Sequence, residues 1–231
     1  MKAEMVIENV NYVVCNLGSE DKRIFEEIMA RPALAGRVPG IADALACLML
    51  AARDDLRKAA AKANGNAAAL KAAEKLIGWV PEHRPDMRGI MESRTGRHIV
   101  TDACYMCVRT ETALDVEKAK TNEKAETFDR IVDGANENRG AELTVPKASE
   151  LRAFCREEKA KHKGEKKFKP LWDLGGTLVD AEFLALELDL LGDGARAWAS
   201  KNNPALCAVY LESETGDGIL MPVKPKPRAG E

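Results

Sequence analysis

Apolar and polar positions alternate in some segments of the chain and follow a helical period in others. Residues 5–14 are β-branched and aromatic at alternate positions, which predicts a strand. The stretch 41–62 is rich in alanine and leucine, the strongest helix formers, and predicts a long helix. Three further helices are predicted from apolar residues that recur every three to four positions. They span 67–79, 147–162 and 181–191.

Short strands are predicted between and after these helices. Residues 87–92 and 97–109 have the composition of two strands around a turn at 94–96. The segment 111–140 is polar and rich in glycine and asparagine, which predicts a loop with at most a short helix. Further strands are expected at 141–146, 171–179 with a turn at Gly175 and Gly176, 195–199, 206–212 and 218–223.

Strands joined by hairpins favour antiparallel sheets, so the predicted fold class is α+β. The expected organisation is a mainly helical region at 1–66, an α+β domain at 67–224 and a disordered tail at 225–231. A chain of 231 residues can bury an ordinary hydrophobic core without disulfides or metals.

The composition is that of an ordinary globular protein. A uniformly basic, histone-like protein is excluded, because 35 Lys and Arg stand against 37 Asp and Glu. No apolar run approaches the roughly 20 residues of a membrane span, and the first residues lack the apolar stretch of a signal peptide. A cytoplasmic protein with reduced cysteines and no membrane partner is therefore predicted.

Motifs for catalysis or metal binding are weak. Cys104 and Cys107 have the spacing of a metal-binding pair, but both fall in the strand predicted over 97–109. Side chains three positions apart on a strand point to opposite faces, so we expect no metal there. No histidine has a catalytic partner at suitable spacing, and there is no glycine-rich phosphate loop. The sequence therefore predicts no catalytic residue, no cofactor and no enzyme, with a small enzyme of unrecognised site as an alternative.

The segment 147–170 is the most basic part of the chain, with nine basic residues against four acidic ones. The candidate DNA-binding residues are Arg152, Arg156, Lys159, Lys163, Lys166 and Lys167. The first four follow a spacing of four, three and four, which places them on one face of the predicted helix. A one-sided basic stripe is typical of contact with a phosphate backbone, although a solvated helix end is the alternative.

Three stretches resemble the bacterial β sliding clamp family of DNA polymerase III. Residues 84–106 are similar to the clamp segment that leads from a helix into a strand pair and ends in the motif T-D-G-H/Y-R-L. Residues 174–191 resemble a strand-to-helix element of the family. Residues 203–224 resemble its last strands and end in L-M-P-V-K, where the family has V-M-P-M-R.

The resemblance implies a DNA-clamp fold with antiparallel sheets and helices on one side, in a shortened relative of phage or mobile-element type. In the family, six such domains form a ring around duplex DNA, with helices lining the hole. Partner proteins insert a short apolar peptide into a pocket. Carried over to this chain, that pocket would use Thr101, Ala103, Tyr105, Met106, Leu220, Met221, Pro222 and Val223. Ala103 stands where the family motif has glycine.

The leading prediction is a non-enzymatic, clamp-like homo-oligomer that contacts duplex DNA and docks replication or repair proteins. A clamp-fold adaptor that binds only proteins is an alternative. It is suggested by the acidic residues Glu182, Glu187 and Asp189, which make the helix over 181–191 unsuited to face DNA.

Overall fold

The computed structural model describes residues 54–165, 168–192 and 194–224. The chain divides into two compact units, Met1–Ala63 and Asn64–Glu231. In the first unit the structure describes the helical residues 54–63. The predicted strand over 5–14, most of the helix over 41–62 and the predicted tail lie outside the described residues.

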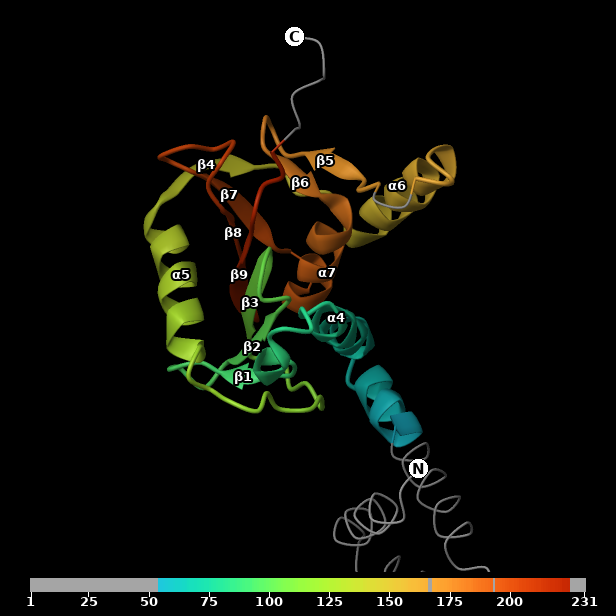
Figure 1. Cartoon of the computed structure of the whole chain (residues 1–231), viewed down its shortest axis with the longest axis vertical. Helices are drawn as coiled ribbons and strands as arrows, with labels where there is room; N and C mark the ends of the chain where they lie inside the picture. The colour runs from blue at the N-terminus through green and yellow to red at the C-terminus, as the bar shows by residue number, and fades with distance from the viewer. Residues whose placement is uncertain (1–53, 166–167, 193, 225–231) are drawn as a thin grey trace, which may run out of the picture. The chain divides into compact units, whose positions relative to one another are not determined.

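The second unit is built on a seven-stranded sheet with the order β1-β2-β3-β9-β8-β7-β4 (Figure 1). Its strands are β1 (Met91–Glu92), β2 (His98–Thr101), β3 (Met106–Thr110), β4 (Arg139–Leu143), β7 (Arg196–Ser200), β8 (Val209–Ser213) and β9 (Gly216–Leu220). A separate hairpin pairs β5 (Leu171–Asp173) with β6 (Leu178–Asp180). All strand pairs are antiparallel, which confirms the predicted sheet type.

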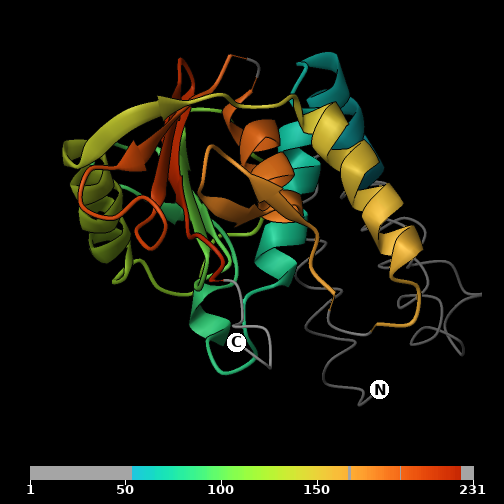
Figure 2. The ribbon, with the colours of Figure 1, turned by 90° about the horizontal axis from the view of Figure 1, so that it is seen from above.

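Three of the helices lie on one side of the sheet (Figure 2). They are α4 (Ala67–Gly78), α6 (Ala148–Lys161) and α7 (Ala181–Leu191), close to the predicted ranges. Helix α7 is apolar almost all round because it packs against α4, α6 and the sheet at once. Its start is fixed by Asp180, whose side chain accepts a hydrogen bond from the Glu182 N–H at 3.0 Å.

A fourth helix, α5 (Ala125–Glu137), covers the opposite face of the sheet (Figure 2). The prediction of a loop with at most a short helix over 111–140 agrees with residues 111–124 but misses α5, a helix of 13 residues. The prediction of helices on one side only is wrong. The apolar positions of α5 are few, and its buried stripe includes a charged residue, Asp129, beside Ala125 and Val132. Ala125, Phe128 and Val132 recur at helical spacing, but the low overall apolarity of the segment and Gly134 obscured this signal in the sequence.

Residues 97–109 also differ from the prediction, because they form a hairpin rather than one strand. β2 and β3 pair antiparallel, with Thr101 opposite Cys107, and the chain reverses between them. The reversal uses neither glycine nor proline, so the usual sequence signal of a turn is missing.

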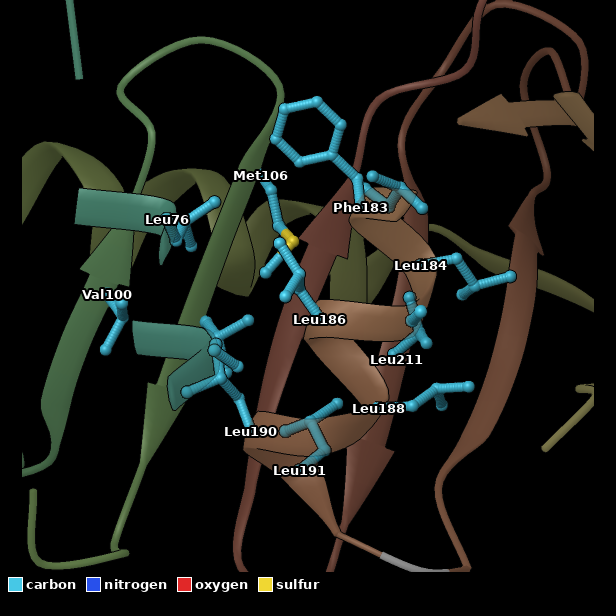
Figure 3. Close-up of a cluster of buried hydrophobic side chains, with 14 of the residues drawn as sticks. Leu76, Val100, Met106, Phe183, Leu184, Leu186, Leu188, Leu190, Leu191 and Leu211 are labelled. Atoms are coloured by element: carbon cyan, nitrogen blue, oxygen red, sulfur yellow. The ribbon is translucent and has the colours of Figure 1, made fainter. Parts of the chain in front are cut away.

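The sheet side chains alternate between two hydrophobic cores. Val100, Val108 and Leu211 belong to the core under α4, α6 and α7, and Figure 3 shows the leucines of α7 that fill it. Their chain neighbours Ile99 and Tyr210 belong to the core under α5. The central strands β3 and β9 are buried along their whole length because both faces of the sheet are covered there, whereas the edge strand β4 has no buried residue.

The seven-stranded sheet contains two similar halves. In the first, α4 is followed by β1, β2 and β3, and in the second, α7 is followed by β7, β8 and β9. The last strands of the two halves, β3 and β9, pair at the centre, while α4 and α7 pack against each other. Among the described residues, no helix has the length and apolarity needed to cross a bilayer.

Candidate functional site

The turn between β2 and β3 is held by the side chain of Asp102, which is buried. Its Oδ1 accepts hydrogen bonds from three consecutive backbone N–H groups. These belong to Cys104, Tyr105 and Met106, at 3.1, 2.8 and 3.0 Å. The carboxylate therefore satisfies donors that have no partner in the sheet.

Thr101 fixes the other side of the same turn. Its hydroxyl donates to the Met106 carbonyl at 2.6 Å and accepts from the Ala103 N–H at 2.9 Å. Ala103 has a φ of 65°, in the left-handed region that glycine favours. This is the position at which the clamp motif has glycine, so alanine is accommodated here at some cost in backbone strain.

The turn lies beside the end of β9, although the two segments are far apart in the sequence. β3 and β9 pair with Met106 opposite Leu220. Beyond that pair, the Met221 N–H donates to the Tyr105 carbonyl at 2.8 Å. The structure thus brings together the two segments from which the pocket was expected.

A pocket of about 490 Å³ opens at this junction. Five of the eight expected residues line it, namely Thr101, Ala103, Tyr105, Met106 and Met221. Leu220 does not, because it points into the core under α7 and is fully buried. Pro222 and Val223 lie outside the lining, and the Val223 N–H donates to the Leu178 carbonyl at 2.8 Å.

Helix α5 supplies a wall of the pocket that sequence reasoning missed. Its contributions are Lys124 at the N-cap, Thr127, Phe128 and Ile131. These positions share one helix face, so their spacing was the available signal. Ile131 and Tyr105 are 46% and 48% exposed, and they are two of the four large apolar residues exposed in the described part of the chain.

The basic stripe on α6 faces carboxylates of α7. Arg152 pairs with Asp189, and Lys159 pairs with Glu182 at 2.6 Å. Burial alone would raise the pKa of Glu182, but its hydrogen bonds to Lys159 and Lys75 outweigh burial and lower it. Arg152 and Lys159, two cations of the stripe, are therefore already paired with a carboxylate.

A groove of about 770 Å³ runs between α4, α6 and α7 beside this stripe. Five basic side chains and two carboxylates line it. The basic ones are Lys71, Lys75, Arg152, Arg156 and Lys159. Lys163 is exposed beyond the end of α6, and Lys166 and Lys167 lie outside the described residues. The groove therefore adds two basic residues of α4 that the sequence analysis did not assign.

Cys104 and Cys107 do not share a strand, so the reason given for separating them was wrong. Cys104 lies in the exposed turn and Cys107 is buried in β3. Burial raises the pKa of the Cys107 thiol, which keeps it protonated at neutral pH. No group of three or more potential metal ligands occurs among the described residues. The absence of a metal stays a prediction.

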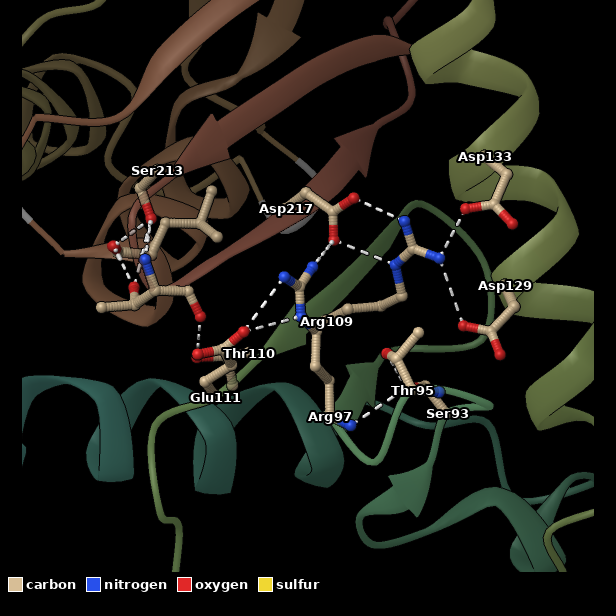
Figure 4. A network of polar contacts seen from close by, with 12 residues as sticks. Ser93, Thr95, Arg97, Arg109, Thr110, Glu111, Asp129, Asp133, Ser213 and Asp217 are labelled. Carbon is tan, nitrogen blue, oxygen red and sulfur yellow. Dashed lines mark hydrogen bonds and ion pairs between the residues drawn. The ribbon is translucent and has the colours of Figure 1, made fainter.

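A buried ionic network joins β3, β9 and α5 (Figure 4). The Arg109 guanidinium donates to both carboxylate oxygens of Asp217, at 2.9 and 2.5 Å. Its Nη1 donates to Asp133 at 2.7 Å and to Asp129 at 3.3 Å. Burial alone would lower the pKa of Arg109, but the hydrogen bonds to Asp217 and Asp133 outweigh burial and raise it. Each of these four residues therefore has an ion-pair partner within the network, and the pairs link α5 to the sheet.

Glu187 on α7 is a buried carboxyl group without the ion pairs of the Arg109 network. It is fully buried, and neither carboxylate oxygen has a hydrogen-bond partner among the described residues. A Cβ at Gly218 would lie 2.6 Å from Glu187 Oε1, so the glycine makes room for the carboxyl group. Burial raises the pKa of Glu187 well above its ordinary value.

Comparison with known proteins identifies no relative of this chain. No protein-family model, curated protein or solved structure matches it. The function is therefore inferred from the residues and the geometry of the sites described above.

Proposed function

We propose that this chain is a non-enzymatic, clamp-like protein that docks partner proteins in the pocket between the β2–β3 turn and the end of β9. The observation that carries the proposal is the contact between these two segments around an apolar hollow. A hollow of this kind suits the large side chains of a short peptide and needs no catalytic group. Replication or repair proteins are the partner class that the resemblance to sliding clamps implies.

Duplex DNA is proposed as the second ligand, at the groove between α4, α6 and α7. The excess of basic over acidic side chains in the groove supports contact with phosphates. Among the described residues, Arg156 and Lys163 have no ion-pair partner and are exposed, so they are the cations most available to DNA. A homo-oligomer would let several such faces act together.

An adaptor that binds only proteins is the second candidate. It is favoured by the ion pairs Arg152–Asp189 and Lys159–Glu182. These cations would have to break an ion pair with a carboxylate before they could bind a DNA phosphate. Helix α5 on the opposite face is a further departure from a clamp domain with helices on one side.

Substitution of Met221 tests the docking proposal. Met221→Asp places a charge in the apolar pocket, so binding of a fluorescent apolar peptide should weaken by about 2 kcal/mol or more. Leu206→Asp is the matched control, because Leu206 is 46% exposed and does not line the pocket. Wild-type affinity in the Met221→Asp variant, measured by fluorescence anisotropy, would overturn the proposal.

A further inference from the structure

We infer that the pocket selects a peptide whose large apolar anchor is flanked by carboxylates, and that α5 makes this selection. The inference rests on the proposed docking function and names the chemistry of the partner. Its basis is the wall that α5 supplies, which lies outside the clamp-like stretches, together with the charged residues at the rim of the pocket.

The apolar anchor would sit between two exposed side chains. Tyr105 projects from the β2–β3 turn and Ile131 from α5, and both line the pocket. Phe128 lies one turn before Ile131 and also lines the pocket, while packing against the hydrophobic cores below. Exposed apolar side chains gathered around one hollow are typical of a protein-interaction site.

The rim of the pocket is more positive than negative. Its charged residues are Arg84, Lys124 and Asp86. Arg84 is held in place because its Nη1 donates to the Ala103 carbonyl at 2.8 Å. Lys124 is exposed at the start of α5 and has no ion-pair partner among the described residues. Lys169 does not line the pocket and pairs with Asp180 at 3.6 Å, but its Nζ lies 4.8 Å from the centroid of the Tyr105 ring.

These charges favour carboxylates on either side of the anchor. Opposite charges at the rim of an interface raise affinity modestly and exclude partners of the wrong sign. The chain's own last residues, PKPRAGE, are a poor occupant, since they contain no large apolar side chain and carry Lys226 and Arg228. On the charge of its rim, we assign the pocket to an acidic-flanked segment of another protein.

The test uses three short peptides that share a leucine and phenylalanine centre and differ in their flanks, which are glutamate, serine or lysine. At low salt, the full-length protein should bind the glutamate peptide roughly fivefold tighter than the serine peptide and roughly tenfold tighter than the lysine peptide. Lys124→Glu should reduce the ratio between glutamate and lysine peptides to about threefold or less. Lys201→Glu, a charge reversal at an exposed residue outside the pocket, should leave that ratio unchanged.

Ile131→Asp should weaken the binding of all three peptides. The thermal melting of this variant shows whether it stays folded. If Met221→Asp abolishes binding while the flanks make no difference, docking stands and the inference is overturned. An unchanged flank preference in Lys124→Glu overturns the role of α5. If the wild-type protein binds none of the peptides, the inference and the proposed docking function both fail.

Discussion

Asp102 shows how much of the pocket depends on one side chain. It is buried, and one of its oxygens accepts three backbone hydrogen bonds that shape the turn. Asp102→Ala leaves these N–H groups without an acceptor and should lower the free energy of unfolding by about 2–3 kcal/mol. Asp102→Asn keeps an acceptor oxygen and should lower the free energy of unfolding by less than Asp102→Ala does. Urea denaturation compares the variants, and an alanine variant as stable as wild type would contradict this role.

The buried carboxyl of Glu187 predicts a pH dependence of stability. Burial raises its pKa in the folded state above the ordinary value of 4.5, so the folded protein keeps a proton that the unfolded chain releases. The contribution of this group is therefore fully present below that value and is lost as the pH rises toward the folded-state pKa.

Glu187→Gln removes this titration. The free energy of unfolding of the glutamine variant, minus that of wild type, should increase from about pH 5 to about pH 8, by about 1 kcal/mol or more. Denaturant unfolding at a series of pH values measures it. A difference between the two proteins that does not change with pH would show that Glu187 is not held as the structure has it.

At the scale of elements, α5 is the helix on which the pocket wall depends. Arg109 ties it to the sheet through Asp129 and Asp133, while also pairing with Asp217 of β9. Arg109→Met leaves the buried Asp129 and Asp217 with only the longer ion-pair contacts to the more exposed Arg94 and Arg97, and should cost about 3–5 kcal/mol. Arg196→Met is the matched control, because its pair with Glu142 is exposed and should contribute less than about 1 kcal/mol. Equal losses in both variants, measured by thermal unfolding, would refute the anchoring role.

The elements differ in how far the sequence predicts them. Helix α7 was predictable because Asp180 caps it and a continuous apolar stretch follows. Helix α5 was not predicted, since part of its buried face is Asp129. The partners of this carboxylate are the Arg94 backbone N–H at 2.8 Å and the Arg109 guanidinium at 3.3 Å, and both come from segments distant in the sequence. The β2–β3 turn was missed for a similar reason, because its signal is the hydrogen bonding of Asp102 rather than a glycine or proline.

At the scale of the whole molecule, the two halves of the sheet meet at β3 and β9, and this pairing builds the pocket. No local sequence pattern predicts that β3 and β9 pair, because the pairing depends on side chains of both hydrophobic cores, which are distant in the sequence. The residues of the turn and of the C-terminal strand were proposed from the resemblance to sliding clamps, whereas the α5 wall required the fold itself.

The proposed DNA contact is also a property of the whole surface. If the groove binds duplex DNA, affinity should fall steeply as salt rises, because lysine and arginine displace counterions. The double variant Arg156→Glu and Lys163→Glu should bind about tenfold more weakly and show a shallower salt dependence. Lys120→Glu, at an exposed residue away from the groove, is the control. Salt-independent binding, or none, would favour the adaptor that binds only proteins.

The most direct test of the central claim is to map where an apolar peptide binds the intact protein. Amide resonances of isotope-labelled protein, recorded while the glutamate-flanked peptide is added, locate the contact without any substitution. The account predicts shifts concentrated in 84–87, 101–107, 124–131 and 219–221, the segments that supply the lining of the pocket. Shifts confined to α4 and α6, or no shifts at saturating peptide, would contradict it.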